Sequence, residues 1–137
     1  MVKTTEEILD ELAKGKTVES VPSELNMLFR PSAQPYLISW LRYDPTKEIA
    51  KLRSHVLVVQ GTTDIQARLQ DAKSLVNANP RAKLVLIDGM NHVLKTVPNE
   101  QDKQVSSYSD PTLPVAPALI SAITRFVNEN EGSGPST

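Results

Sequence analysis

The stretch from residue 55 to residue 89 constrains the fold most, because strand and helix patterns alternate within it. HVLVVQG (55–61) and KLVLIDG (83–89) are apolar, β-branched runs that each end at a glycine. Between them, residues 67–78 carry apolar side chains at helical spacing, and Asn79-Pro80 ends that pattern. Strand, helix and strand within about 35 residues predict a right-handed parallel crossover. We therefore expect an α/β fold with a short parallel sheet whose strands span 55–60 and 83–88.

Helical patterns surround this unit. Thr4 to Glu7 has the form of a capping box, and Gly15 follows the apolar stripe as a stop. Further helices are expected to begin near Pro22, to be capped by Ser32, to run from Pro45 to Leu52, and to run from Pro117 to about Asn128. The predicted organisation is a helical cap-like segment over 1–43, an α/β core over 44–130 and a disordered polar tail over 131–137.

Composition excludes several classes of function. The chain has 137 residues, 39% of them apolar, which favours one hydrophobic core in one domain. Lys and Arg total 15 against 16 Asp and Glu, so no large positive field favours nucleic acid or an anionic membrane. There is no cysteine, and no apolar run is long enough for a signal peptide or a membrane span. We expect a cytoplasmic protein without a disulfide or a thiolate metal site.

Two polar side chains follow the predicted strands at matching positions. Asp64 and His92 each lie three residues after the glycine that ends a strand. Because parallel strands end at the same edge of a sheet, the two side chains are expected to lie close together. A carboxylate that accepts the Nδ1 proton of an imidazole leaves Nε2 free as a general base. Taken alone, an aspartate and a histidine at loop edges are more often solvated or structural than catalytic.

These residues resemble a known family. VLVVQGTTDIQ and DAKSLVNANPRAKLVLIDGMNHVLK look like the C-terminal part of an α/β-hydrolase-fold serine hydrolase or esterase, and LFRPSAQPYLISWLRYDPTKEIAKL resembles the segment that leaves its cap. The resemblance covers about residues 5 to 128, with its specific part at 56 to 95. It implies that Asp64 is the acid and His92 the base of a catalytic triad.

The nucleophile of that family is absent from this sequence. The family places its serine in a Gly-x-Ser-x-Gly turn between a strand and a helix. The five glycines here form no such pentapeptide, and Gly132-Ser133-Gly134 lies in the polar tail. Three interpretations remain open: a non-catalytic remnant that associates or binds a ligand, a hydrolase fragment completed by a missing N-terminal half or a partner chain, and an interaction module that uses a long loop over 93–115.

A sheet of two strands leaves an unpaired edge, which favours association. We expect a homodimer that pairs exposed sheet edges or exchanges N-terminal helices, with no nucleic acid, membrane, metal or cofactor as partner.

Other polar and aromatic residues have a structural interpretation beside a functional one. Thr62, Thr63 and Gln66 either orient a ligand beside Asp64 or satisfy loop backbone groups. His55 is expected at the amino end of the first strand, away from the chemistry. An acyl pocket or simple helix packing is expected for a set of aromatic residues: Phe29, Tyr36, Trp40 and Tyr43.

Overall fold

The computed structural model describes residues 4–131 of the chain, which divides into two compact units, residues 1–45 and 46–137. Each unit has its own cluster of buried apolar side chains, where the composition predicted one core. The division lies close to the boundary expected after residue 43. Of the predicted disordered tail, residues 132–137 lie outside the described residues.

The N-terminal unit begins with α1 (Thr5–Ala13), and the predicted capping box is confirmed. The Glu7 amide donates to Thr4 Oγ1 at 3.3 Å, and the Thr4 amide donates to Glu7 Oε2 at 2.8 Å. Ile8 and Leu12 of this helix are fully buried, and they pack with three further buried residues: Val18, Phe29 and Ile38.

Two details of the predicted helices in this unit are wrong. The second helix is broken into η1 (Ser23–Leu25) and α2 (Asn26–Phe29), and η2 (Pro31–Ala33) precedes α3 (Gln34–Leu41). Ser32 does not cap α3, because it lies inside the 3-10 turn and the N-cap position falls on Ala33. A residue in a turn lacks the extended backbone that a side-chain cap requires.

A buried glutamine ties α3 to the segment that follows α1. The Gln34 side chain is 0% exposed, accepts from the Val18 amide at 2.7 Å and donates to the Val18 carbonyl at 2.8 Å. Its Nε2 also donates to the Phe29 carbonyl at 2.8 Å. These hydrogen bonds satisfy the polar groups of a loop that crosses an apolar core, where an unpaired group is costly.

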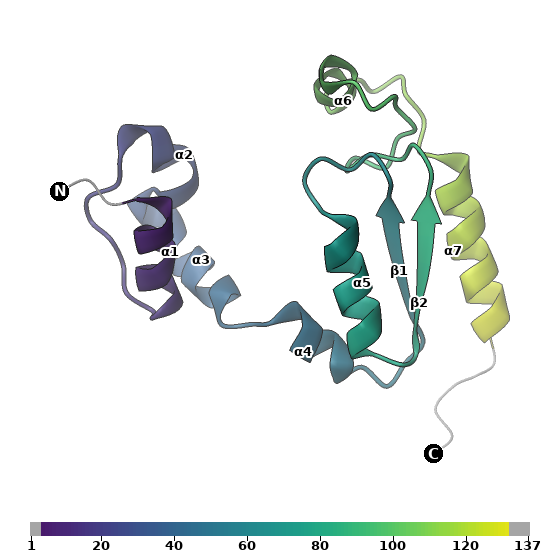
Figure 1. The fold of residues 1–137 in the computed structure, drawn as a ribbon, viewed down its shortest axis with the longest axis horizontal. Helices are drawn as coiled ribbons and strands as arrows, with labels where there is room; N and C mark the ends of the chain where they lie inside the picture. Colours follow the sequence, from purple (N-terminus) through teal and green to yellow (C-terminus); the bar gives the residue numbers. More distant parts are fainter. Residues whose placement is uncertain (1–3, 132–137) are drawn as a thin grey trace. The chain divides into compact units, whose positions relative to one another are not determined.

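The C-terminal unit is built on two parallel strands, β1 (Val56–Gly61) and β2 (Ala82–Ile87), whose pairing runs from Val56↔Ala82 to Gly61↔Ile87. This confirms the predicted parallel strand–helix–strand unit, with each strand within one residue of its expected position. After α4 (Pro45–Ala50), α5 (Leu69–Ala78) covers one face of the sheet and α7 (Pro117–Asn130) lies over the other (Figure 1). Val59, Val85 and Ile87 pack with Leu119 of α7 in the core of this unit.

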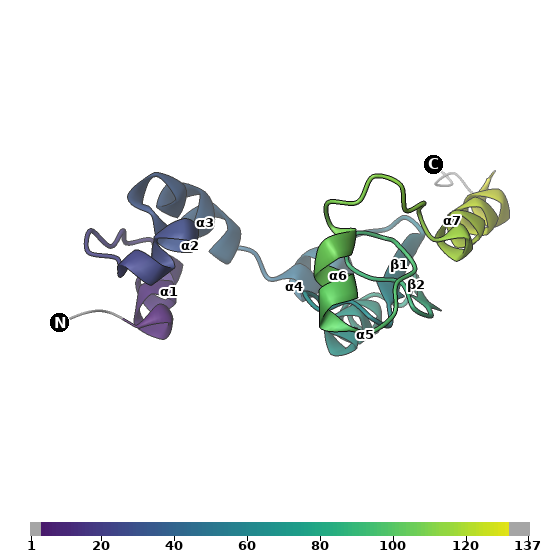
Figure 2. The same ribbon diagram turned by 90° about the horizontal axis from the view of Figure 1, so that it is seen from above.

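Residues 93–115 are not a continuous loop, so that prediction is wrong. They contain α6 (Gln101–Ser107), which lies beyond the carboxyl ends of the strands in Figure 1 and, in the view from above in Figure 2, over α5 and beside the strands. Two isolated antiparallel bridges, Met90↔Thr96 and Lys95↔Val115, tie the flanking segments together. Lys95 Nζ also donates to the carbonyls of Ser107 and Asp110. Loop length was the only support for an interaction module, and that support is lost.

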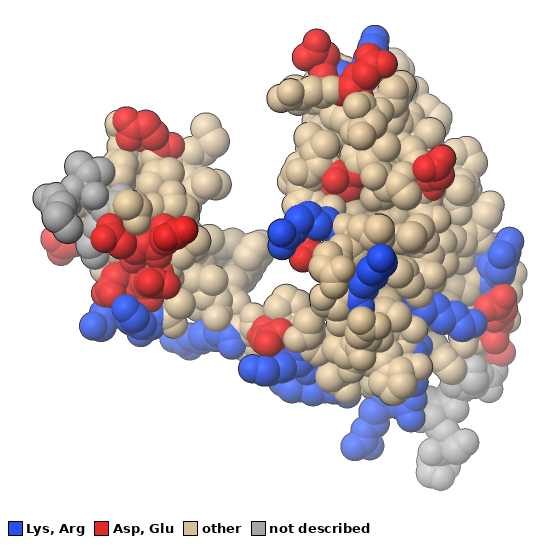
Figure 3. Space-filling model, viewed as in Figure 1, with Lys and Arg blue, Asp and Glu red and all other residues tan. Residues whose placement is uncertain are grey.

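Charged side chains are unevenly distributed over the surface. In Figure 3, Lys and Arg gather along the lower edge of the C-terminal unit, near α4 and the turn between α5 and β2.

None of the helices within residues 4–131 is long and apolar enough to cross a membrane.

Candidate functional site

The two loops that leave the strands run side by side because glycine occupies the last position of β1. The Thr63 amide donates to the Met90 carbonyl at 3.2 Å, which brings the backbones into close contact. A Cβ atom at Gly61 would lie 1.9 Å from the Met90 carbonyl oxygen. Only glycine permits this approach, and it places the loop of Asp64 against the loop of His92.

Thr62 holds the same two loops together. Its hydroxyl donates to Asp88 Oδ1 at 3.0 Å and accepts from the Gly89 amide at 2.9 Å. Gly89 has a φ of +68°, which suits the tight turn after β2. Of the two interpretations for Thr62, the structure therefore favours a role in the loops. The neighbouring Thr63 hydroxyl is buried and has no hydrogen-bond partner among the described residues.

Asp64 and His92 lie in direct contact, as their positions predicted. His92 Nδ1 lies 3.0 Å from Asp64 Oδ2. The Asp64 side chain is 8% exposed and that of His92 is 43% exposed, so the carboxylate lies beneath an accessible imidazole. Within residues 4–131, Asp64 is the only hydrogen-bond partner of the His92 ring.

The carboxylate of Asp64 is held by backbone amides. Its Oδ1 accepts from the amides of Gln66 at 2.7 Å and Ala67 at 2.9 Å. Burial raises the pKa of Asp64, but those amides and the His92 ring favour the ionised form and leave the pKa below its ordinary value. An ionised carboxylate only accepts hydrogen bonds, so it favours the tautomer in which His92 Nδ1 donates. Nε2 then carries the lone pair of a general base.

Sequence reasoning missed the residues that support this pair. Gln60 Nε2 donates to Asp64 Oδ2 at 3.3 Å and to the Ala67 carbonyl at 3.2 Å. From its position near the end of β1, Gln60 therefore holds the loop that carries Asp64. Asn91 is buried and donates to Ser107 Oγ of α6 at 2.7 Å, which anchors the backbone before His92. A glutamine inside the apolar run VLVVQG was the one available signal for Gln60.

An apolar hollow of about 310 Å³ lies next to the acid. Ile65 and Gln66, which follow Asp64 directly, line it with Val105 and Tyr108 of α6. Gln66 Nε2 donates to the Tyr108 hydroxyl at 2.8 Å and links the loop to the helix. The apolar part of a ligand could bind in this hollow, whose lining begins at Ile65, the residue after Asp64.

The remaining candidates lie elsewhere. His55 is exposed and precedes β1 at its amino end, as expected. In the N-terminal unit Phe29 is buried in the core, which fits helix packing. The other aromatic residues expected there are exposed: Tyr36, Trp40 and Tyr43. Among residues 4–131, no group of three His, Asp or Glu side chains is arranged to hold a metal ion.

Comparisons with protein-family models, with curated proteins and with solved structures found no match to this chain. The geometry of the site defines its class: a carboxylate orients an accessible imidazole at the carboxyl edge of a parallel sheet. Such a pair can accept a proton from a nucleophile, although the described residues bring no serine within hydrogen-bond distance of His92.

Proposed function

We propose that this chain supplies the acid and the base of a serine-hydrolase-type site and does not hydrolyse esters by itself. The contact between His92 Nδ1 and Asp64 Oδ2 at 3.0 Å carries the proposal. It is supported by the resemblance of the strand-end loops to the C-terminal part of an α/β-hydrolase-fold esterase. In this role Asp64 orients the imidazole, and His92 takes the proton of a serine that another segment or another chain provides.

The route to a complete site is an additional strand at the edge of the sheet. Within the described residues, β1 pairs only with β2, so its other edge has unpaired backbone groups. A nucleophile-bearing segment that added a strand there would bring its turn to the edge where His92 lies. The apolar hollow beside Asp64 would suit the acyl or alcohol part of an ester.

The tautomer of His92 provides a direct test. We expect the ring ¹⁵N chemical shifts at neutral pH to show a proton on Nδ1, because Asp64 accepts it. His55 is the internal control, since it is exposed and no hydrogen bond or ion pair joins its ring to another residue within 4–131. Asp64→Asn should move His92 toward the behaviour of His55. If the two rings of the wild-type protein behave alike, the pairing that carries the proposal does not exist in solution.

Ester hydrolysis tests the second half of the proposal. The isolated chain and His92→Ala should hydrolyse p-nitrophenyl butyrate at equal rates, and a fluorophosphonate should label neither, because the nucleophile is missing. A neighbouring reading frame that encodes Gly-x-Ser-x-Gly would supply the partner. Its product should restore hydrolysis that depends on His92. Hydrolysis by the isolated chain that disappears in His92→Ala would contradict the proposal.

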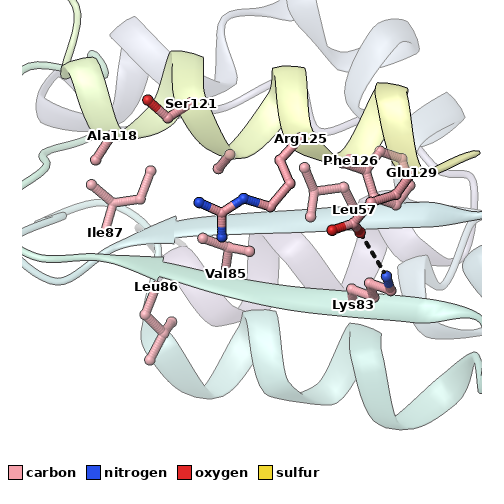
Figure 4. A pocket seen from close by; sticks show the side chains of 11 residues that line it. Leu57, Lys83, Val85, Leu86, Ile87, Ala118, Ser121, Arg125, Phe126 and Glu129 are labelled. Carbon is pink, nitrogen blue, oxygen red and sulfur yellow. Dashed lines mark hydrogen bonds and ion pairs between the residues drawn. The ribbon is translucent and has the colours of Figure 1, made fainter.

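We infer as a second function that the chain self-associates, and the state of the sheet favours this. The four apolar residues that begin β1 are only half-buried: Val56, Leu57, Val58 and Val59. A hollow of about 420 Å³ lies between the sheet and α7. Figure 4 shows Leu57 and Val85 on the sheet side of this hollow and Arg125 reaching toward the sheet from α7. Three further apolar side chains of α7, the helix that carries Arg125, are exposed: Ile120, Ile123 and Val127. This much apolar surface on one unit is typical of an interface.

Light scattering at micromolar concentration should give the mass of a dimer. Removal of residues 1–45 distinguishes the two modes of pairing: an edge-to-edge dimer persists, whereas a dimer built by helix exchange becomes monomeric. A well-folded monomer of the full chain would rule out this second function.

A further inference from the structure

A second hollow lies at the amino end of the strands, opposite the edge that carries Asp64 and His92. It has a volume of about 480 Å³, within the range of small-molecule sites, roughly 300–1,000 Å³. Two segments form it: residues 50–53, which follow α4, and residues 79–81, which precede β2. It is independent of the proposed hydrolase site, because the two sites share no residue.

The two segments are tied together by a buried asparagine. Asn79 is 2% exposed, and its Nδ2 donates to the carbonyls of Ile49 at 2.7 Å and Leu52 at 3.2 Å. Its Oδ1 accepts from the Arg81 amide at 2.8 Å. Both ends of this side chain therefore hold backbone, which gives the hollow a rigid wall before any ligand arrives.

Among the residues that the structure describes, three cations and no acid line the hollow. Lys51 is paired with Glu48 at 2.6 Å, so its charge is largely compensated. Arg81 Nη1 donates to the Arg53 carbonyl at 2.6 Å, which holds that guanidinium at the rim. Within residues 4–131, neither Arg53 nor Arg81 has an ion pair, so the charges of both arginines remain uncompensated. Figure 3 shows that basic side chains gather along this lower edge of the unit.

We propose that this hollow binds a small phosphorylated ligand. A guanidinium matches the oxygens of phosphate with parallel N–H groups, and Arg81 keeps free N–H groups after its bond to Arg53. Two uncompensated arginines match the two charges of a phosphate monoester, whereas a carboxylate would leave one of them unneutralised. Nucleic acid fits less well, because the whole chain has a net charge of −1 and a polyanion needs a longer track of cations.

The test is an NMR titration of the full chain with inorganic phosphate and with glycerol 3-phosphate, at constant ionic strength. Saturable shifts are expected at the amides of Lys51, Arg53 and Arg81. Arg53→Gln should weaken binding about tenfold, the effect of losing one charge-assisted hydrogen bond. This variant leaves the fold intact, because within residues 4–131 Arg53 takes part in a hydrogen bond through its backbone carbonyl and not through its side chain.

Lys73→Gln is the matched control, because it removes a positive charge from an exposed side chain of the same unit that lines none of the hollows described above, and it should leave binding unchanged. Equal loss in both variants, or equal shifts with sodium chloride alone, would overturn the proposal as a general charge effect. Tighter binding of a short DNA oligonucleotide, with shifts spread beyond the hollow, would overturn it in favour of a nucleic-acid surface. None of these outcomes bears on the tautomer of His92, so the two proposals succeed or fail separately.

Discussion

At the scale of single residues, Gly61 carries a steric requirement that its neighbours do not. Gly61→Ala would place a methyl group 1.9 Å from the Met90 carbonyl oxygen. The atom it meets belongs to the backbone, so a change of side-chain rotamer cannot relieve the clash. We expect the free energy of unfolding to fall by at least about 3 kcal/mol, near the upper end of overpacking costs. Urea denaturation measures this, and the Asp64–His92 pairing should weaken with it.

Gly15→Ala is the comparison for that prediction. Gly15 has a φ of +78° but nothing lies within 4 Å of an added Cβ. Only the backbone strain remains, so the expected loss is about 1 kcal/mol. Equal losses at Gly15 and Gly61 would contradict the close approach of the two loops.

The pH dependence of stability should depend on Asp64. Its pKa is lower in the folded protein than in the unfolded chain, so the ionised form stabilises the fold. That contribution is fully present above the unfolded pKa of about 4 and is lost as the pH falls through the lower, folded pKa. The advantage of wild type over Asp64→Asn in urea midpoint should thus be constant from pH 7 to pH 5 and shrink below pH 4. An advantage that grows in acid would contradict the sign.

At the scale of elements, the attachment of α3 depends on Gln34. Gln34→Leu keeps the volume but leaves the amide and carbonyl of Val18 and the carbonyl of Phe29 buried without their partner. We expect a loss of at least about 3 kcal/mol in the N-terminal unit, since three buried groups lose their partner and each unsatisfied group costs about 1–3 kcal/mol. Loss of hydrogen-exchange protection at the Val18 amide checks it. Gln104→Leu, at a buried glutamine of the other unit, should leave the Val18 amide protected.

The segment after His92 shows why some elements escape sequence patterns. Three prolines and many polar residues in 93–115 suggested a loop, yet α6 forms there. Tertiary bonds outweigh the weak local preference: Asn91 reaches Ser107, and Lys95 caps the end of the helix through the carbonyls of Ser107 and Asp110. Helices of this kind depend on partners distant in the chain, which periodicity cannot register.

At the scale of the whole molecule, two separate cores predict two unfolding transitions. The fluorescence of Trp40, the single tryptophan, reports the N-terminal unit, and the ring signals of His92 report the other. Ile8→Ala should destabilise only the Trp40 transition and Leu119→Ala only the His92 transition, each by about 2–5 kcal/mol. If either variant shifts both transitions equally, the units unfold as one cooperative body.

The sequence alone determined the parallel crossover, the capping box of α1 and the pairing of Asp64 with His92. Each of these depends on local spacing: a period of two or 3.6, a Thr and a Glu three residues apart, or equal distances from the glycines that end two parallel strands. Residues at equal distances past the ends of two parallel strands lie close together in space. The contact between Asp64 and His92 could therefore be predicted without knowing any other tertiary contact.

Only the tertiary structure decided what surrounds those features. The Gln34 contacts, the Gln60 brace and the hollow of Lys51, Arg53 and Arg81 join residues whose separation in sequence carries no period. The sequence has 15 basic and 16 acidic residues, a balance that predicts no charged partner. Composition gives the number of charges and not their positions in the fold, so it could not predict a local cluster of arginines. Side chains that are far apart in the chain meet only once the loops that bear them have packed, and that packing is a property of the fold.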